Sequence, residues 1–381
     1  MGDGSVKFVE QNLLNTDLTL NLSQNIPWTG GSLFLETSAQ RMDLFSEHKY
    51  SWQTSPIMIG YRQSLFGYNS LKWDKRIEPV RYQEAKKSYV ETLELVSANA
   101  INKFFALATA QSNYDIASFN YANADTLYRY AQGRYNIGTI TENEMLQLEL
   151  NRLTEETNRM NARIEMDNCM QELRSYLGIQ EEREIRVRVS SRIPDFSINL
   201  NEALALAYEN SPDIQTMKRR KLESESAVAR ARANAGLKAD IYLRFGLTQT
   251  ADKLPEAYRN LLDQQYVSLS ISLPILDWGR GKGQVRVARS NRDLVYTQVE
   301  QNRTDFELNV RKLVKQFNLQ TQRVRIAART DETAQRRNEV ARKLYILGKS
   351  TILDLNASIS EKDSARRNYV SALYNYWSLY Y

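Results

Sequence analysis

Two parts of the chain alternate between apolar and polar residues with a period of two. The clearer part ends with four apolar residues separated by serines: Val267, Ser268, Leu269, Ser270, Ile271, Ser272 and Leu273. The earlier part, at about 18–66, alternates less regularly. Successive side chains on a strand point to opposite faces, so this pattern predicts strands with one apolar and one polar face. We expect two strands within 18–66 and two within 238–276, joined by polar loops at 43–55 and 251–265.

Each strand region is followed by a long segment with the signals of a helix. The segment 284–347 contains neither Gly nor Pro, and the segment 73–132 contains no Gly and only Pro79, near its start. Apolar residues in the later segment recur with the spacing of a coiled-coil seam: Phe306, Val310, Leu313, Phe317, Val324 and Ala327. A helix of roughly 65 residues spans about 100 Å. We expect a return helix after each long one, over 141–177 and 351–381.

The two halves of the chain repeat each other. Tyr135–Thr141 matches Tyr345–Thr351 at an offset of 210 residues, and Ser64–Gly67 matches Pro274–Asp277 at the same offset. In both halves the end of the strand-like run therefore lies 71 residues before the matched Gly of the turn. This conserved spacing within one chain predicts an internally duplicated architecture.

The duplication predicts a mixed, mainly α fold in three parts. The parts are a first repeat at 1–177 with strands at about 18–66 and a helical hairpin at about 73–177, a linker with equatorial helices at 178–236, and a second repeat at 237–381 with strands at about 238–276 and a helical hairpin at about 284–381. The linker helices break at Ser211 and Pro212. The first repeat lacks a counterpart of the second repeat's opening helix. We therefore expect this chain to be trimmed at its N-terminus, and also at Tyr381, where it ends in mid-pattern.

Composition narrows the class of protein. Hydrophobic residues make up 42% of the 381 residues and the mean hydropathy is −0.55, so no segment approaches the roughly 18–20 apolar residues of a membrane helix. Residues 1–5 lack the basic start and the apolar core of a signal peptide. The chain is then cytosolic, or a mature or trimmed form of an exported protein. The 51 basic and 45 acidic residues are interspersed, which favours exposed, salt-bridged helices over a nucleic-acid groove.

No combination of residues indicates catalysis or a bound cofactor. His48 is the only histidine, which excludes a His-rich metal site and a Ser-His-Asp triad. Gly348–Thr351 is similar to the end of a P-loop, but the earlier Gly is missing and a helix precedes it. Gly279–Gly283 fits neither phosphate-binding spacing, and Cys169 is alone in a helical stretch, where we expect a packed thiol. We therefore expect no enzymatic activity, no cofactor and no metal site.

Two functions from different classes are compatible with these patterns. Strands with one apolar and one polar face fit a barrel wall between lipid and water. They also fit the half-exposed accessory sheet of a soluble coiled-coil scaffold or interaction protein without a membrane barrel. The duplicated strand pairs and the equal 71-residue spacings favour the barrel. An export signal encoded by the full gene would favour the barrel, because a soluble scaffold should lack one.

Three kinds of motif together resemble the TolC-like outer-membrane efflux protein family. They are the opener Leu200–Pro212, the strand end Leu273–Arg280, and the turns Tyr-x-x-Gly-x-x-Thr that begin at Tyr135 and Tyr345. The resemblance covers nearly the whole chain, and the order and duplication of the motifs make it specific. It implies the TolC-like fold, in which long antiparallel coiled-coil hairpins form an α-helical tunnel. It also implies that four strands from each of three chains close a twelve-stranded β-barrel, and that the linker and the terminal segments make an equatorial collar.

By this resemblance the protein is an exit duct in the outer membrane of a Gram-negative bacterium, with a periplasmic extension. A homotrimer would pass small molecules or polypeptides outward in a tripartite efflux pump or a type I secretion system. The implied partners are a periplasmic adaptor, an inner-membrane transporter and outer-membrane lipid, with no nucleic acid.

The resemblance also assigns the two turns to periplasmic tips that contact the adaptor. The residues concerned are Gly138, Thr141, Gly348 and Thr351. A Gly that ends a helix accommodates a left-handed backbone, so a purely structural cap is the other interpretation of these turns.

The family closes its tunnel near the tips, and motif alignment assigns the channel gate to Glu144, Tyr345 and Asp354. We hypothesise that Tyr345 bonds Glu144 across hairpins, and that three copies of Asp354 ring the bore and favour cations. A solvated helix face is the alternative role for both acids. Ser350 and Ala357 depart from the family pattern, which predicts a looser or differently tied gate.

Overall fold

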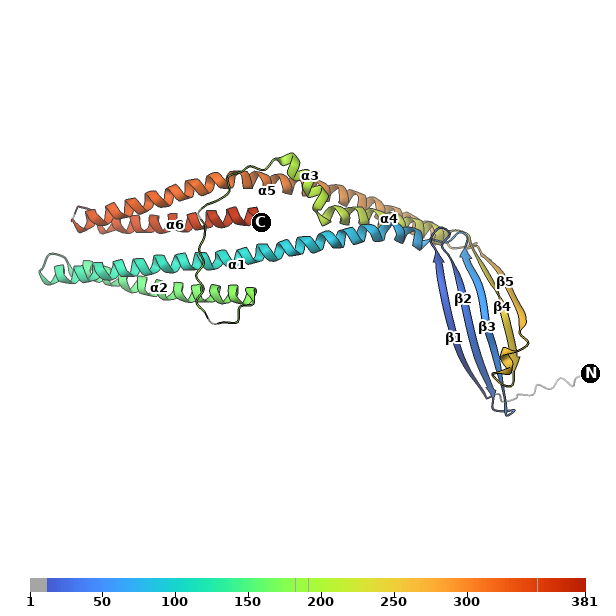
Figure 1. Ribbon diagram of the computed structural model, residues 1–381. Coiled ribbons are helices and arrows are strands. Elements are labelled where there is room, and N and C mark those ends of the chain that lie inside the picture. The colour runs from blue at the N-terminus through green and yellow to red at the C-terminus, as the bar shows by residue number, and fades with distance from the viewer. Residues whose placement is uncertain (1–11, 182, 191, 348) are drawn as a thin grey trace, which may run out of the picture. The chain divides into compact units, whose positions relative to one another are not determined.

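The computed structural model describes residues 12–381, apart from residues 182, 191 and 348. The elements of this part of the chain are β1 (Leu13–Ile26), β2 (Gly31–Leu44), β3 (Lys49–Ser64), α1 (Ser70–Asn136), α2 (Glu142–Leu177), α3 (Leu200–Asn210), α4 (Pro212–Ala235), β4 (Lys238–Ala251), a 3-10 helix (Glu256–Tyr258), β5 (Leu262–Ser272), α5 (Arg280–Ile346) and α6 (Ile352–Tyr380) (Figure 1). The predicted mixed, mainly α fold is therefore confirmed. The predicted break between the linker helices at Ser211 is confirmed as well.

The chain divides into two compact units. The first combines Met1–Ala85 with Pro212–Arg303 and contains the described strands, α4 and the adjoining ends of α1 and α5. The second combines Lys86–Ser211 with Thr304–Tyr381 and contains α2, α3, α6 and the rest of α1 and α5. Each unit draws on both predicted repeats. The predicted domain boundaries themselves stay a prediction.

The strands form one antiparallel sheet in the order β1–β2–β3–β4–β5. β3 and β4 come from different repeats, and their pairing places Ile59 opposite Phe245. The expected number of four strands is wrong, because the described part of the chain has five. Residues 13–44 form a hairpin of two strands, closed by a turn at Gly30, whose left-handed φ of 78° suits a residue without a Cβ.

The expected polar loops are also shorter than predicted. β3 begins at Lys49 and β5 at Leu262, inside the ranges that we assigned to loops. The polar residues Ser51 and Gln53 continue the ladder opposite Met42 and Gln40. Polar residues at alternate positions face one side of a sheet without ending the strand, so polarity alone does not mark a loop.

The two faces of the sheet differ in chemistry. The register places Leu35, Ile59 and Phe245 side by side, and these side chains are 40%, 49% and 44% exposed. The same face carries further exposed apolar side chains: Leu18, Leu20, Leu22, Leu33, Ile57, Val267, Leu269 and Ile271. The opposite face is polar and includes an ion pair of 3.3 Å between Arg244 and Glu36. The protomer alone therefore leaves a continuous apolar face uncovered.

A small core lies on the polar face of the sheet. The Phe34 ring lies over Gly60 and stacks on Tyr242 at a centroid distance of 5.8 Å. Met58 is fully buried beside Gly246. The two glycines leave the space that these side chains fill, and a Cβ at Gly60 would overlap the Phe34 ring.

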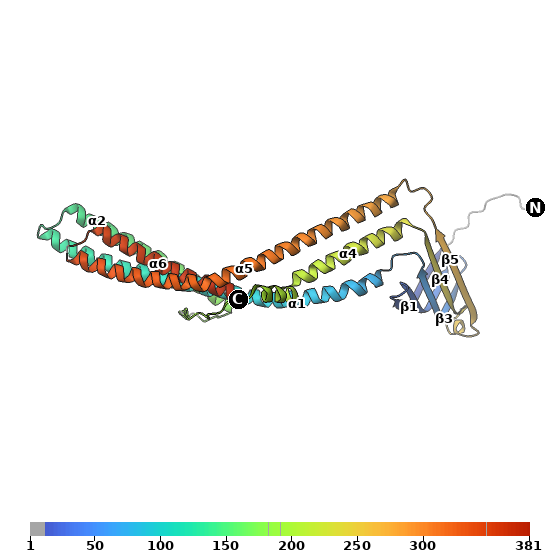
Figure 2. The same ribbon diagram turned by 90° about the horizontal axis from the view of Figure 1, so that it is seen from above.

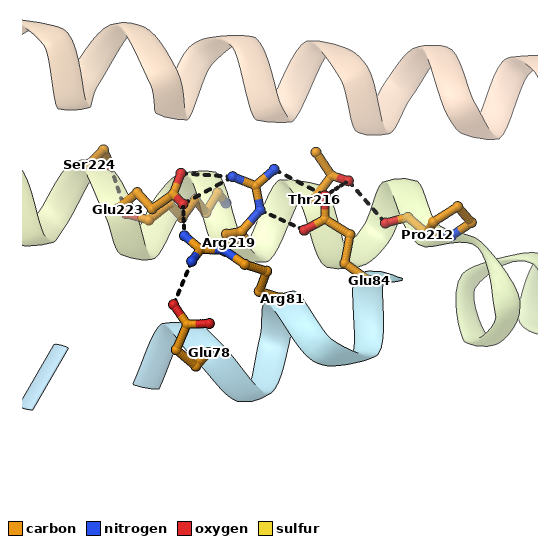
Figure 3. Close-up of polar contacts among 9 residues, drawn as sticks. Glu78, Arg81, Glu84, Pro212, Thr216, Arg219, Glu223 and Ser224 are labelled. Atoms are coloured by element: carbon orange, nitrogen blue, oxygen red, sulfur yellow. Dashed lines mark hydrogen bonds and ion pairs between the residues drawn. The ribbon is translucent and has the colours of Figure 1, made fainter. Parts of the chain in front are cut away.

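Close to the sheet, α4 lies between α1 and α5 in both views (Figures 1 and 2). Arg219 of α4 binds Glu84 of α1 at 2.6 Å and Glu223 at 3.0 Å (Figure 3). Thr216 also donates to Glu84, at 2.9 Å. The Arg219 guanidinium holds the pKa of Glu84 below its usual value. On the other side of α4, Lys221 and Glu225 bond to α5, at Glu300 and Tyr296. These bonds fix α4 to both neighbouring helices.

The second unit contains the tip-side parts of the two predicted helical hairpins, α1–α2 and α5–α6. One buried cluster includes Phe105, Phe317 and Tyr376, and a second includes Leu107 and Leu173. The linker between α2 and α3 packs on both clusters and bonds to side chains of the hairpins, including the Tyr376 hydroxyl, which donates to the Pro194 carbonyl at 2.7 Å. None of the described helices has a stretch that is long and apolar enough to cross a membrane.

The close approach of Phe34 to Gly60 predicts the effect of one substitution in the sheet. Gly60→Ala forces the Phe34 ring out of place, and overpacking of this kind costs about 1–3 kcal/mol. We expect Gly60→Ala to lower the free energy of unfolding by that amount in denaturant titrations. Gly133→Ala is the control, because that helical glycine has no neighbour within 4 Å and Ala favours a helix. Equal stability of the two variants would contradict the packing described here.

The Glu84–Arg219 pair predicts a pH dependence of stability. The folded pKa of Glu84 is lowered, so the pair stabilises the fold fully above the usual glutamate pKa of 4.5 and loses this effect as the pH falls through the folded pKa. We expect Glu84→Gln to reduce the free energy of unfolding by about 1 kcal/mol at pH 7 and by much less near pH 3. The measurement is chemical denaturation at both pH values, with the exposed Glu91→Gln as control. A loss that does not depend on pH would count against the ion pair.

Candidate functional site at the hairpin tips

The first tip joins α1 to α2 through a left-handed glycine. The Gly138 φ is 71°, its N–H donates to the Tyr135 carbonyl at 2.8 Å, and the Thr139 N–H donates to the Arg134 carbonyl at 2.9 Å. These bonds satisfy carbonyls at the end of α1 that have no partner within the helix. A Cβ at Gly138 would meet nothing within 4 Å, so the position requires Gly for its backbone conformation and not for space.

The start of α2 is closed by a capping box. The Thr141 hydroxyl accepts from the Glu144 N–H at 3.3 Å, and the Glu144 carboxylate accepts from the Thr141 N–H at 3.1 Å. This reciprocal pair satisfies two N–H groups and places a negative charge at the positive end of the helix dipole. Thr141 and Glu144, which we assigned to different roles, therefore act together in the local structure.

The second tip repeats these contacts. The Lys349 N–H donates to the Leu344 carbonyl at 2.9 Å, the counterpart of the Thr139 bond in the first tip. Thr351 and Asp354 form the second capping box, with the Asp354 N–H donating to the Thr351 hydroxyl at 3.2 Å. Gly348, which we assigned to adaptor contact, lies outside the described residues.

Asp354 is held as a carboxylate by its neighbours. One of its oxygens accepts from the Thr351 hydroxyl at 2.7 Å, and from the Thr351 N–H and the Ser350 hydroxyl at 3.3 Å each. These bonds, led by the one from the Thr351 hydroxyl, keep the pKa of Asp354 below its usual value. The side chain is exposed, so it is a charged group available at the tip.

Tyr345 faces the first hairpin. It lines a cavity of about 150 Å³ together with Leu127 and Tyr130 of α1. Burial raises the pKa of the Tyr345 hydroxyl, while the charge of Arg134 lowers it and that of Glu144 raises it. The structure therefore brings Tyr345 within electrostatic reach of Glu144. It contains no hydrogen bond between these two described side chains, and the gate assignment of Glu144, Tyr345 and Asp354 stays a prediction.

Sequence reasoning missed a set of buried polar links between the hairpins. The Asn120 amide of α1 donates to Asp363 of α6 at 2.6 Å, and both residues are buried. The Lys362 ammonium lies 3.2 Å from Asp363, and Arg366 bonds Asp331 of α5 at 3.1 Å. Buried charges of this kind need partners, so these residues couple α1 to α6 and α6 to α5. Polar residues inside a coiled-coil seam are the signal that could have identified them.

Comparison with known proteins agrees with this architecture. The model of the family described as Outer membrane efflux protein matches residues 203–378. The fold is similar to that of the Campylobacter jejuni CmeC outer membrane channel, with a TM-score of 0.66, 14% identity, and coverage of 97% of this chain and 76% of that one. VceC, an outer membrane protein of Vibrio cholerae, gives a TM-score of 0.65 at 14% identity, with coverage of 97% and 85%. The outer-membrane channel OprN gives 0.67 at 17% identity, with coverage of 97% and 80%. No curated protein matches the sequence.

These findings confirm the resemblance that the motifs predicted. Residues 203–378, which include most of the second repeat's helical hairpin, carry the sequence pattern of the outer membrane efflux proteins. The identities of 14–17% support similarity of fold alone, and that fold is the one of TolC-like channels.

The left-handed turn at Gly138 predicts a local effect at the first tip. Gly138→Ala imposes a conformation that costs a residue with a Cβ about 1–2 kcal/mol. We expect amide hydrogen exchange of residues 134–144 to accelerate about tenfold, with little change in the sheet. Gly138→Asn should have a smaller effect, because Asn tolerates the left-handed region. Unchanged exchange in Gly138→Ala would mean that the turn does not depend on this conformation.

Proposed function

We propose that this protein is the outer-membrane duct of a tripartite efflux pump or a type I secretion system, and that it acts as a homotrimer. The observation that carries the proposal is the amphipathic sheet, whose exposed apolar face extends over the described strands and whose other face is polar. A barrel wall between lipid and a water-filled lumen has this alternation.

The edges of the sheet support closure with other copies. Among the described residues, β1 and β5 each pair with a strand on one side only. In a lipid environment the backbone N–H and C=O groups of an open edge have no water to bond, so spanning strands must close into a barrel. One sheet of this size is too small to enclose a channel. A cyclic assembly of identical chains satisfies the edges, and we infer that three copies form it.

The helical hairpins supply the periplasmic part of the proposed duct. α1 and α5 have 67 residues each, about 100 Å of helix at 1.5 Å per residue. Equal lengths allow the two tips to end at the same level of a tunnel. We infer that the residues of the two tips, Gly138, Thr141, Gly348 and Thr351, contact a periplasmic adaptor. An inner-membrane transporter supplies the energy, and the duct needs no cofactor or catalytic group.

At the tips, we infer that the gate is formed by Glu144, Tyr345 and Asp354. The support for it is the exposed, ionised Asp354 and the position of Tyr345 against the first hairpin. Symmetric copies of an exposed carboxylate around a narrow bore attract cations and reject anions. A soluble scaffold, the rival function, offers no partner for an apolar sheet face, so we favour the duct.

Conductance in planar lipid bilayers tests both the channel and its gate. Purified protein that is threefold symmetric by electron microscopy should conduct ions and prefer cations. Asp354→Asn should lower the cation preference and weaken block by divalent cations, because it removes a charge from each copy. Glu165→Gln, an exposed acid on α2 away from the tips, is the matched control. Compact particles without conductance would overturn the duct, whereas normal selectivity in Asp354→Asn would overturn only the charge ring.

A further inference from the structure

The most exposed large apolar side chains of the described chain gather at one end of the sheet. Trp278, Ile275, Trp28 and Leu276 are 91%, 88%, 86% and 78% exposed. Trp28 lies in the turn between β1 and β2, and the other three lie between β5 and α5. The strand register puts both segments at the end of the sheet from which α1 and α5 leave (Figure 1). We call residues 27–30 and 273–279 the helix-side rim.

Hydrogen bonds hold both segments of the rim in place. The Asn69 amide, just before α1, donates to the Pro27 carbonyl at 2.9 Å. The Asp277 carboxylate accepts from the N–H groups of Gly279 and Gly281, at 2.9 and 2.8 Å. These bonds attach the rim to the starts of the two long helices. The exposed apolar side chains are therefore presented by an ordered backbone.

Trp278 is held in a conformation that residues with a Cβ usually avoid. Its φ is 54°, in the left-handed region, where a bulky side chain is strained. Among the described residues, no other ring and no cationic side chain packs on the Trp278 ring, and almost all of its surface is exposed. Strain of this kind persists where a function uses the conformation. Within the described residues, the Arg280 N–H donates to the Asp277 carbonyl at 2.9 Å across this turn, so the turn holds the Trp278 ring outward, free for a contact outside the protomer.

Basic side chains accompany the apolar rim. The first turns of α1 and α5 contain no acidic residue, although acids are favoured at helix N-termini. Lys72 lies at the start of α1, and Arg280 and Lys282 lie at the start of α5. The acids near this end of the sheet include Asp277, whose oxygens are engaged in the cap of α5, Asp74, two residues after Lys72, and Asp240 of β4, opposite Ser64 and Ser270. Basic side chains beside the N–H groups of a helix start favour an anion, and phosphate in particular.

We propose that the helix-side rim lies in the headgroup region of a phospholipid leaflet and binds anionic phospholipids. Trp rings beside basic residues suit the boundary between acyl chains and headgroups, where the ring is partly buried and the cation meets phosphate. Continuity with the apolar face of the sheet places the rim at the edge of the span. The inference rests on the proposed function, because it requires that face to span a membrane, and it adds a lipid class to it.

Depth-dependent quenching tests the position of the rim. In the full chain carrying Cys169→Ser, a fluorophore is attached after Ile275→Cys in the rim, Ile59→Cys on the apolar face, or Ile137→Cys at a hairpin tip. Each protein is reconstituted into vesicles of phosphatidylcholine and phosphatidylglycerol with lipids brominated near the headgroup or near the chain end. The Ile59 label should be quenched by deep bromines, the Ile275 label by shallow ones, and the Ile137 label by neither.

The labels separate failure of the rim from failure of the duct. An unquenched Ile59 label would overturn the proposed function itself. A quenched Ile59 label together with an unquenched Ile275 label would overturn only the rim inference, because the rim would then lie in water or against a neighbouring copy.

Lipid preference is measured with the same Ile275 label by titration with detergent micelles that contain phosphatidylglycerol or phosphatidylcholine. We expect half-saturation at about tenfold less phosphatidylglycerol, since each basic group near an anionic surface contributes substantially to binding. Arg280→Gln with Lys282→Gln should abolish this difference. Arg311→Gln with Lys312→Gln, the same charge change on an exposed part of α5, should keep it. Equal half-saturation by the two lipids in the parent protein would overturn the proposal.

Discussion

One constraint dominates this structure: a single sheet exposes many apolar side chains on one face and has open edges at β1 and β5. Leu35, Ile59 and Phe245 meet across strands of both repeats and still remain on the surface. The core on the opposite face is small and centres on Phe34 and Met58. The described protomer leaves this apolar face uncovered, and the proposed duct accounts for it with lipid on that face and further copies at the sheet edges.

The helices are stabilised differently, by capping boxes at the tips and by apolar side chains that pack between neighbouring helices. Capping boxes at Thr141 and Thr351 end the two turns with the same contacts, so the tips are defined by a few neighbouring residues. Between the tips and the sheet, the helices are joined by polar contacts such as Arg219 with Glu84 and Asn120 with Asp363. The caps are therefore local to the tips, whereas the polar cross-links are distributed along the helices.

The gate residues that we assigned at the tips have a structural role first. Glu144 and Asp354 each complete a capping box, which fixes the carboxylate at a helix start and, at Asp354, keeps it ionised. Tyr345 instead lies against the neighbouring hairpin, where burial controls its hydroxyl. The cap therefore accounts for the position and the charge of Asp354, and its part in the proposed gate is a separate matter for the conductance measurement.

The sequence by itself determined the long helices, the turns at their tips and the period-two strand regions, but not the number of strands or where each strand begins. Period-two runs defined the strands near Val267, Gly-free segments defined α1 and α5, and the turns at Gly138 and Thr351 have their expected positions. Only the tertiary structure decided that β3 pairs with β4, that β1 is a separate strand, and that Asn120 meets Asp363. Periodicity and capping are local properties of neighbouring residues. A pairing across more than a hundred residues depends on which distant surface is available, and no local pattern specifies that.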